Sequence, residues 1–294
     1  MRFTLKGSIP ALVTPFHDDF TVNFDKLGEL IEFHIKANSP GILILGTTGE
    51  SATIDFNEQI EIVKYTVAKV AGRVHVMVGS GSNQTTTAIK ASQTFEKLGA
   101  DSLLLVTPYY NRTNDSGMIK HFEAIANSVN VPVMLYTVPA RTGCNIEPHV
   151  IEHLAKHPNI IGIKDATNDF SYSMRISRYV SDEFVLYSGN DNTIIPLLSI
   201  GATGVISVWA NYAPKTVNKL VTSYLEGRHS EALTLQQENL DFINTLFIET
   251  SPIPLRYIMN KTGFDIGPAR LPLDELSDSG KIIIDKLLKE GEEK

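Results

Sequence analysis

Eight short apolar runs recur along the chain, and they constrain the fold more than any other feature. Each run carries aliphatic or β-branched side chains on both faces, as parallel strands buried on both sides of a sheet do. The runs begin near Ser8, Gly41, Val74, Ser102, Val131, Ile160, Phe184 and Gly204. They therefore predict eight buried parallel strands.

Amphipathic helical segments separate the apolar runs. Residues 25–36, 57–70 and 85–98 each place their apolar side chains on one stripe of a helix. Gly99 and Gly201 stand where a helix ends before the next strand. Strands that alternate with helices predict a parallel sheet, and eight such units predict a closed (β/α)8 TIM barrel rather than an open sheet.

The strand pattern stops near residue 225, and the rest of the chain reads as helices. We therefore expect a barrel that carries the catalytic site at residues 1–225 and a small helical C-terminal region at residues 226–294. No linker rich in Ser, Gly or Pro separates the two parts, so this region should pack on the barrel. A chain of 294 residues has room for both, since such barrels need about 250 residues.

Composition argues against several classes of protein. The net charge of -7 and the absence of a Lys/Arg cluster argue against nucleic-acid binding. No apolar run approaches the ~20 residues that span a bilayer, and the first residues lack the apolar segment of a signal peptide. Cys144 is the only cysteine, which excludes an intrachain disulfide and a cysteine-based zinc site. These features favour a cytoplasmic protein.

Polar residues and glycines gather where the predicted strands end. In a barrel of this kind the carboxyl ends of all strands meet at one rim, which is where catalytic groups lie. The segments concerned are Gly46–Glu50, Pro108–Asn111, Tyr136–Gly143, Lys164–Asp165 and Ser188–Asp191. One strand that ends in polar residues is common in loops, whereas several such ends at one rim indicate a catalytic site.

Lys164 is the most informative single residue, because it ends a strand that is otherwise apolar. Alternation puts Gly162 and Lys164 on one face of this strand, and Ile161 and Ile163 on the face toward the helices. A lysine inside the barrel loses hydration, which lowers the pKa of its amine and makes it a nucleophile. From this pattern alone, a lysine paired with Asp165 is an equally good interpretation.

Three other strand ends offer groups that suit the chemistry of an activated amine. Tyr136 could move protons beside an imine, although an aromatic ring that closes the barrel interior explains it equally well. Thr47 and Thr48 offer hydroxyls and backbone N–H groups to a carboxylate, with a plain turn as the alternative. Arg141 could clamp a carboxylate, although an exposed loop arginine has the same local sequence.

The segment His149–His153 matches the H-x-x-E-H zinc pattern, and His157 follows one turn later. It falls on the helix after the fifth strand, outside the barrel and away from the rim. A solvated helix face explains it better than a metal site, so we expect no metal here.

The motifs at the strand ends resemble those of the dihydrodipicolinate synthase family, in the superfamily of N-acetylneuraminate lyase and 2-keto-3-deoxy-acid aldolases. The resemblance runs over essentially the whole chain, and the motifs occur in family order. They are GTTGESAT at 46–53, TPYYNR at 107–112, LYTVPARTG at 135–143, IIGIKDAT at 160–167, YSGND at 187–191, GVISV at 204–208 and SPIP at 251–254.

The resemblance implies a Schiff-base lyase of the class I aldolase type, acting in diaminopimelate and lysine biosynthesis. Lys164 would form an imine with pyruvate, and Tyr136 would shuttle protons, linked through Thr47 to Tyr110. In this family the second tyrosine crosses a dimer interface, so Tyr110 would serve the neighbouring subunit. The resemblance therefore also implies a homodimer or homotetramer.

The resemblance assigns the remaining site residues to substrate binding. Thr48 and Ile206 would hold the pyruvate carboxylate, and Gly189 would line the pocket. Arg141 would bind the carboxylate of the second substrate, L-aspartate 4-semialdehyde, and this arginine separates the synthases from relatives of the sialic-acid lyase type. The chemistry needs no metal or other cofactor.

Four positions depart from the family pattern, at Thr137, Ser251, Arg256 and Trp209, and none of them removes a catalytic group. Trp209 follows the eighth strand, where it could trim the pocket and change the choice of aldehyde.

The allosteric lysine site of some family members differs more strongly in this chain. Phe56, Gln59 and Thr87 stand where the family uses two histidines and a glutamate, although Asn83 and Tyr109 remain. Loss of the glutamate removes the carboxylate that would pair with the ammonium of lysine. We therefore predict weak or absent feedback inhibition by lysine.

Two other functions compete with the synthase at this stage. A lyase or aldolase of a sugar-derived 2-keto acid, such as N-acetylneuraminate or 2-keto-3-deoxygluconate, would share Lys164 and Tyr136 without needing Arg141. A catalytically silent metabolite-binding barrel would need none of these groups, and the intact Lys164, Tyr136 and Thr47 argue against it.

Overall fold

The computed structural model of the chain describes residues 5–292. All strand pairs are parallel, in the order β1-β8-β7-β6-β5-β4-β3-β2. A bridge between Ala11 and Leu43 joins the first strand to the second and closes the ring. The strands are β1 (Gly7–Pro10), β2 (Gly41–Ile44), β3 (His75–Gly79), β4 (Ser102–Val106), β5 (Val133–Thr137), β6 (Ile160–Asp165), β7 (Val185–Ser188) and β8 (Gly204–Ser207). The predicted eight-stranded barrel is confirmed.

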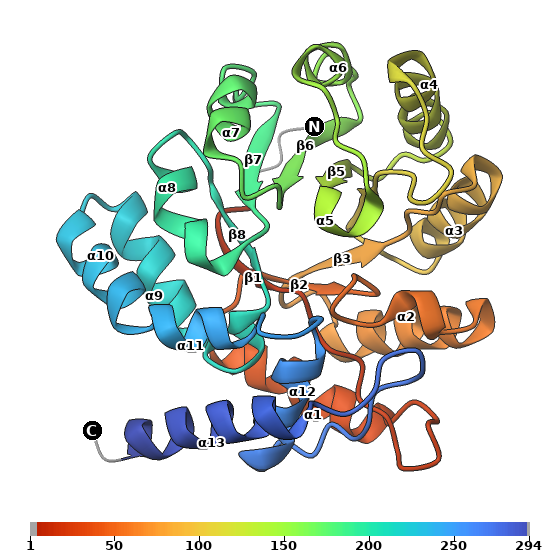
Figure 1. The fold of residues 1–294 in the computed structure, drawn as a ribbon. Helices are drawn as coiled ribbons and strands as arrows, with labels where there is room; N and C mark the ends of the chain where they lie inside the picture. The colour runs from red at the N-terminus through yellow and green to blue at the C-terminus, as the bar shows by residue number, and fades with distance from the viewer. Residues whose placement is uncertain (1–4, 293–294) are drawn as a thin grey trace.

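Helices surround the strands on the outside of the barrel, except the four-residue α5, which lies closer to the middle of the ring (Figure 1). The predicted helices at 25–36, 57–70 and 85–98 are α1, α2 and α3, with ends that differ by one residue at most. The helices of the barrel are α1 (Phe24–Lys36), α2 (Phe56–Val70), α3 (Thr85–Lys97), α4 (Asp115–Ala126), α5 (Pro139–Thr142), α6 (Pro148–Leu154), α7 (Phe170–Ser177), α8 (Ile194–Leu198) and α9 (Pro214–Leu225).

Four further helices follow the barrel, as the apolar pattern predicts. They are α10 (His229–Glu238), α11 (Leu240–Thr245), α12 (Ile253–Lys261) and α13 (Asp278–Glu292). Figure 1 shows the blue helices α12 and α13 on the side of the barrel that also carries α1. The ring of Phe264, after α12, packs edge-on against Phe33 of α1 with centroids 5.3 Å apart. Within residues 5–292, no helix is long and apolar enough to cross a membrane.

The buried side chains form two separate apolar clusters. The larger one lies between the strands and the surrounding helices. The smaller one fills the barrel interior, and it includes Met134, Tyr136, Tyr187 and Ile206. A polar group placed in this interior is therefore cut off from water on every side except the rim.

One prediction about β6 is wrong. Ile161 belongs to the interior cluster, although simple alternation places it toward the helices. The pairing of β5 with β6 is irregular, because Val133 pairs with Ile160 while the next residue, Met134, pairs with Gly162. The extra residue turns Ile161 inward. Regular alternation resumes at Gly162, so the predicted orientation of Lys164 is unaffected.

Candidate active site

Lys164 lies at the carboxyl end of β6 with 5% of its surface exposed. Its neighbours in register are Tyr136 on β5 and Tyr187 on β7. The Nζ atom stands 4.2 Å from the centroid of the Tyr136 ring. No carboxylate in the described part of the chain forms an ion pair with this amine. The lysine is therefore buried without the direct charge partner that usually permits burial.

Asp165 does not pair with Lys164. Its carboxylate accepts hydrogen bonds from the Ser173 hydroxyl at 2.5 Å and from the Thr167 hydroxyl at 2.7 Å. Ser173 belongs to α7, so Asp165 points outward while the preceding lysine points into the barrel. The alternative of a lysine balanced by the next residue is excluded.

Burial lowers the pKa of the Lys164 amine from 10.5 to about 7. The charge of Asp191 opposes this shift, and the charge of Arg141 adds to it. Desolvation dominates because the ammonium form loses most of its hydration in the barrel interior. A substantial share of the amine is therefore unprotonated near neutral pH, as nucleophilic attack requires.

Tyr136 is buried beside the amine, with 6% of its surface exposed. Burial raises the pKa of its phenol, while hydrogen bonding with Thr47 and the charge of Arg141 act in the opposite direction. The phenol therefore carries its proton at neutral pH. A protonated phenol beside the amine can donate a proton where negative charge develops.

The loop after β2 brings Thr47 and Thr48 to the rim. Thr48 is buried and Thr47 is half-buried. The backbone N–H of Gly49 donates to the carbonyl of Gly46 at 3.1 Å, and that of Glu50 donates to the carbonyl of Thr47 at 3.1 Å. These bonds fold the loop into consecutive turns, which hold both threonines in place.

Gly189 and Ile206 are the last two residues that the sequence predicts for the pocket. The Gly189 N–H donates to the carbonyl of Asp165 at 2.7 Å, and a Cβ here would stand 2.7 Å from the Cβ of Ala166. A larger residue at 189 would therefore collide with the strand that carries Lys164. Ile206 is fully buried in the interior cluster.

Arg141 lies on α5, near enough to shift the pKa of both Lys164 and Tyr136. Its Nη2 donates to the carbonyl of Ser251 at 2.6 Å. The side chain is otherwise exposed, so its remaining N–H groups can face an anionic substrate.

Tyr110 is not brought together with the other predicted residues within one chain. It is 94% exposed, and its φ of 67° is in the left-handed region. The structure thus assembles Lys164, Tyr136, Thr47 and Arg141 and leaves this tyrosine on the surface.

A family model described as the dihydrodipicolinate synthetase family matches residues 4–291. The chain belongs to the dihydrodipicolinate synthetase family.

Relatives cover almost the whole chain. The 4-hydroxy-tetrahydrodipicolinate synthase of a Thermoanaerobacter species is 46% identical over 293 residues, which are 97% of this chain and 98% of the relative. That of Clostridium perfringens is 44% identical over 284 residues, 97% of each chain. The solved synthase structure from Methylacidiphilum fumariolicum superposes with a TM-score of 0.96 at 37% identity, over 99% of this chain and 97% of that one.

Asp191, to which the sequence analysis gave no role, lies close enough to Lys164 for its charge to act on the pKa of the amine. The residue is 1% exposed, and its carboxylate accepts hydrogen bonds from the Ser207 hydroxyl at 2.5 Å and from the N–H groups of Val208 and Trp209 at 3.0 and 2.8 Å. Burial raises the pKa of Asp191, and these hydrogen bonds oppose that shift. The usable signal was its place at a strand end inside the YSGND motif.

Trp209 does not trim the pocket. It is 1% exposed and packs in the outer apolar cluster rather than in the barrel interior. Its backbone follows β8 into the turn capped by Asp191, which directs the side chain toward the helices.

His149, His153 and His157 pair individually with residues of α4 and with Asn127, which follows it. His149 contacts Asp115 at 2.8 Å, and His153 contacts Glu123 at 2.8 Å. His157 contacts Asn127 at 3.0 Å. Among residues 5–292, no group of three His, Cys, Asp or Glu side chains is placed to hold a metal ion.

The lowered pKa of Lys164 predicts that Lys164→Met stabilises the fold. The shift from 10.5 to about 7 corresponds to at most roughly 5 kcal/mol of native-state penalty. Below pH 7 both native and unfolded states bear the proton, so the penalty is complete. Between pH 7 and 10.5 the unfolded state binds more protons, so wild-type stability rises with pH and the advantage of the variant shrinks.

Urea unfolding at pH 6.5 and 9.5 measures this difference. Lys156→Met is the matched control, because the Lys156 side chain is 73% exposed, and we expect it to change the free energy of unfolding little at either pH. A Lys164→Met variant no more stable than wild type at pH 6.5 would contradict the assignment.

Proposed function

We propose that this family member condenses pyruvate with L-aspartate 4-semialdehyde to give 4-hydroxy-tetrahydrodipicolinate, in diaminopimelate and lysine biosynthesis. The observation that carries the proposal is the unpaired Lys164 amine, buried against the Tyr136 ring with its pKa lowered to about 7. The relatives bear the name of this synthase, which supports the same activity here. A solved structure of the Acinetobacter baumannii synthase, 36% identical with a TM-score of 0.94, holds pyruvate.

The proposed reaction begins at the Lys164 amine. The amine attacks the carbonyl carbon of pyruvate, and loss of water gives an imine. The imine draws electrons from the methyl group, so a methyl proton leaves and an enamine forms. The enamine carbon attacks the aldehyde, and the amino group of the second substrate then displaces Lys164 and closes the ring. Tyr136 supplies protons where alkoxide charge develops.

The substrate carboxylates determine the roles of the remaining residues. In the proposal, Thr48 and Ile206 hold the pyruvate carboxylate while Gly189 leaves the space that it needs. Arg141 binds the carboxylate of the aldehyde substrate through the N–H groups that Ser251 does not occupy.

The names of the relatives favour the synthase over a lyase or aldolase of sugar-derived 2-keto acids. The presence of Arg141 at the rim argues in the same direction. A silent metabolite-binding barrel would have no use for an uncharged amine beside a protonated phenol.

We further propose that the enzyme works as a homodimer or homotetramer in the cytoplasm. Tyr110 is 94% exposed in one chain, as a residue that serves a neighbouring subunit would be. An exposed tyrosine with fixed left-handed backbone geometry suits an interface contact. The single cysteine, Cys144, suits a reducing compartment.

Borohydride reduction in the presence of pyruvate is expected to attach the substrate permanently to Lys164. Reduction converts the imine to a stable secondary amine, which mass spectrometry locates on the peptide that carries residue 164. Lys164→Ala should remain unmodified. An unmodified wild-type protein, or an adduct on another lysine, would contradict the proposed function.

Arg141→Ala is expected to raise the KM for aspartate semialdehyde by about tenfold to a hundredfold, because a charged hydrogen bond contributes roughly 1.5–3 kcal/mol. Pyruvate trapping on Lys164 should persist, since Arg141 is assigned to the other substrate. Arg175→Ala, on the exposed face of α7, is the control and should leave both quantities unchanged. An unchanged KM for aspartate semialdehyde in Arg141→Ala would refute this role.

L-Lysine at sub-millimolar concentration is expected not to inhibit the enzyme. The centroid of the Phe56 ring lies 5.0 Å from Nζ of Lys90. The Gln59 amide donates a hydrogen bond to the carbonyl of Ile54 at 2.9 Å. These side chains already have partners within the chain, and Thr87 provides no carboxylate for the ligand. Steady-state rates with added lysine test this, with the Cyanidioschyzon merolae synthase, whose structure holds lysine, as the positive control for binding.

A further inference from the structure

The loop that carries Thr47 and Thr48 has an unfavourable backbone. Leu45 and Glu50, on either side of the threonines, have φ values of 54° and 56°. Non-glycine residues rarely adopt this left-handed region, so contacts elsewhere must hold the loop in its shape.

Glu50 supplies such a contact through a fully buried carboxylate. Its Oε1 accepts a hydrogen bond from Arg256 Nε at 2.5 Å, and the two side chains are 0% and 4% exposed. Its Oε2 accepts from the backbone N–H of Arg270 at 3.1 Å. Glu50 thus ties the loop to the C-terminal region, 206 residues away in sequence.

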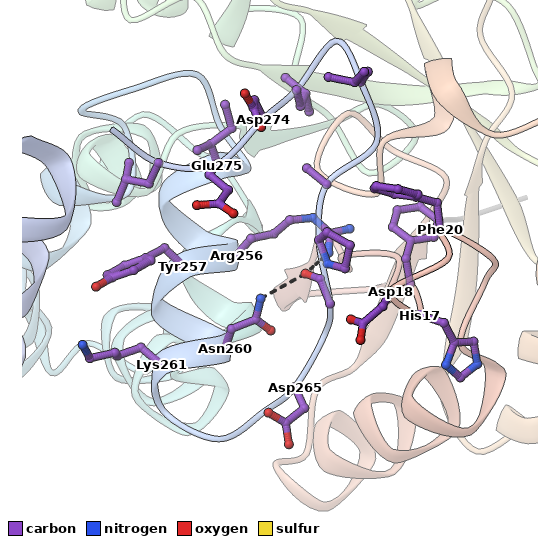
Figure 2. Close-up of a pocket in the computed structure, with 18 of the residues that line it drawn as sticks. His17, Asp18, Phe20, Arg256, Tyr257, Asn260, Lys261, Asp265, Asp274 and Glu275 are labelled. Carbon is purple, nitrogen blue, oxygen red and sulfur yellow. Dashed lines mark hydrogen bonds between the residues drawn. The ribbon is translucent and has the colours of Figure 1, made fainter. Parts of the chain in front are cut away.

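Arg256 is itself held from several directions. Its Nη2 donates to the carbonyl of Thr14 at 2.5 Å, and its Nη1 donates to the carbonyls of Ile266 and Gly267, both at 3.1 Å. Figure 2 shows the side chain extending from α12 toward the segment that carries Asp18 and Phe20. These three residues line a cavity of 1010 Å³. The guanidinium can move little without breaking these bonds.

A second path of hydrogen bonds connects the threonine loop to Arg256 through Thr14. The Thr14 hydroxyl donates to the carbonyl of Gly49 at 2.7 Å, directly before Glu50. The loop is therefore fixed twice to the same cation, by the Glu50 carboxylate and through Thr14. Because the Glu50 N–H bonds to the Thr47 carbonyl at 3.1 Å, the position of Glu50 also determines that of Thr47.

We infer that Glu50 is a positioning residue for Thr47 and Thr48, and that it acts through Arg256 of the C-terminal region. The inference rests on the proposed function, which assigns both threonines to the site. Loss of one partner leaves the other charge buried and unpaired, so the loop would shift to bring that charge toward water. The C-terminal helices are thereby a necessary part of the pyruvate site.

Glu50→Gln is expected to raise the KM for pyruvate at least tenfold, while trapping at saturating pyruvate still labels Lys164. Arg256→Gln should have the same effect, and Arg256→Lys should restore most of the wild-type KM because it keeps the charge. The double variant Glu50→Gln with Arg256→Gln removes both buried charges. It keeps the test possible if a single variant fails to fold. It too should show the raised KM, because the ion pair that ties the loop to α12 is lost even though no unpaired charge remains.

Glu58→Gln is the matched control. Glu58 accepts from the guanidinium of Arg270 at 2.6 and 2.7 Å, whereas Glu50 accepts only from the backbone N–H of Arg270. Glu58 therefore also ties the C-terminal region to the barrel, but from α2 rather than from the threonine loop. A purely structural role for Glu50 predicts the same KM in both variants. Positioning predicts that only the Glu50 variant changes.

Hydrogen exchange of the amides at residues 46–51 separates this inference from the proposed function. Faster exchange in Glu50→Gln but not in Glu58→Gln supports the positioning role, even if the wild type proves unable to trap pyruvate. Unchanged exchange in Glu50→Gln, or equal effects of both variants on the KM, would overturn the inference.

Discussion

The proposed activity of this protein depends on one costly arrangement, an amine buried without a direct counter-ion inside a closed barrel. The interior cluster around Lys164 is apolar or aromatic, and the nearest groups in register are the rings of Tyr136 and Tyr187. A lysine in such surroundings favours its neutral form, because the ammonium loses hydration that the protein does not replace. By excluding water, the barrel interior thus favours the uncharged form of this amine.

The charged groups around this amine do not cancel the lowering of its pKa. Asp191 would favour the ammonium, but its carboxylate is engaged by two backbone N–H groups and the Ser207 hydroxyl. Asp165, next in sequence, faces α7. Arg141 at the rim acts in the opposite direction to Asp191. Fixing both carboxylates in other hydrogen bonds allows Lys164 to remain unpaired.

The sequence was sufficient to predict most of the barrel and the orientation of the key lysine. Buried parallel strands have an apolar pattern that needs no tertiary information, and Gly162 indicates the face that Lys164 shares. Ile161 was misplaced because an irregular strand pairing depends on the partner strand, which a single strand's pattern does not reveal. Trp209 was misplaced for a similar reason, since the turn after β8 is set by Asp191.

Contacts between distant segments were beyond sequence reasoning. Arg256 appeared only as a departure from the family pattern, and nothing local connects it with Glu50, 206 residues earlier. Local sequence patterns predict which helices and strands form. The buried ion pair between Glu50 and Arg256 depends instead on how the C-terminal helices pack on the barrel.

Direct titration of the Lys164 amine tests the central claim most directly. Selective ¹³C labelling of lysine at Cε, with the signal assigned by its loss in Lys164→Met, allows NMR to follow protonation at this one residue. We predict a midpoint near pH 7, where an exposed lysine titrates near 10.5. A midpoint close to 10.5 would contradict the account, since the amine would then be solvated or paired.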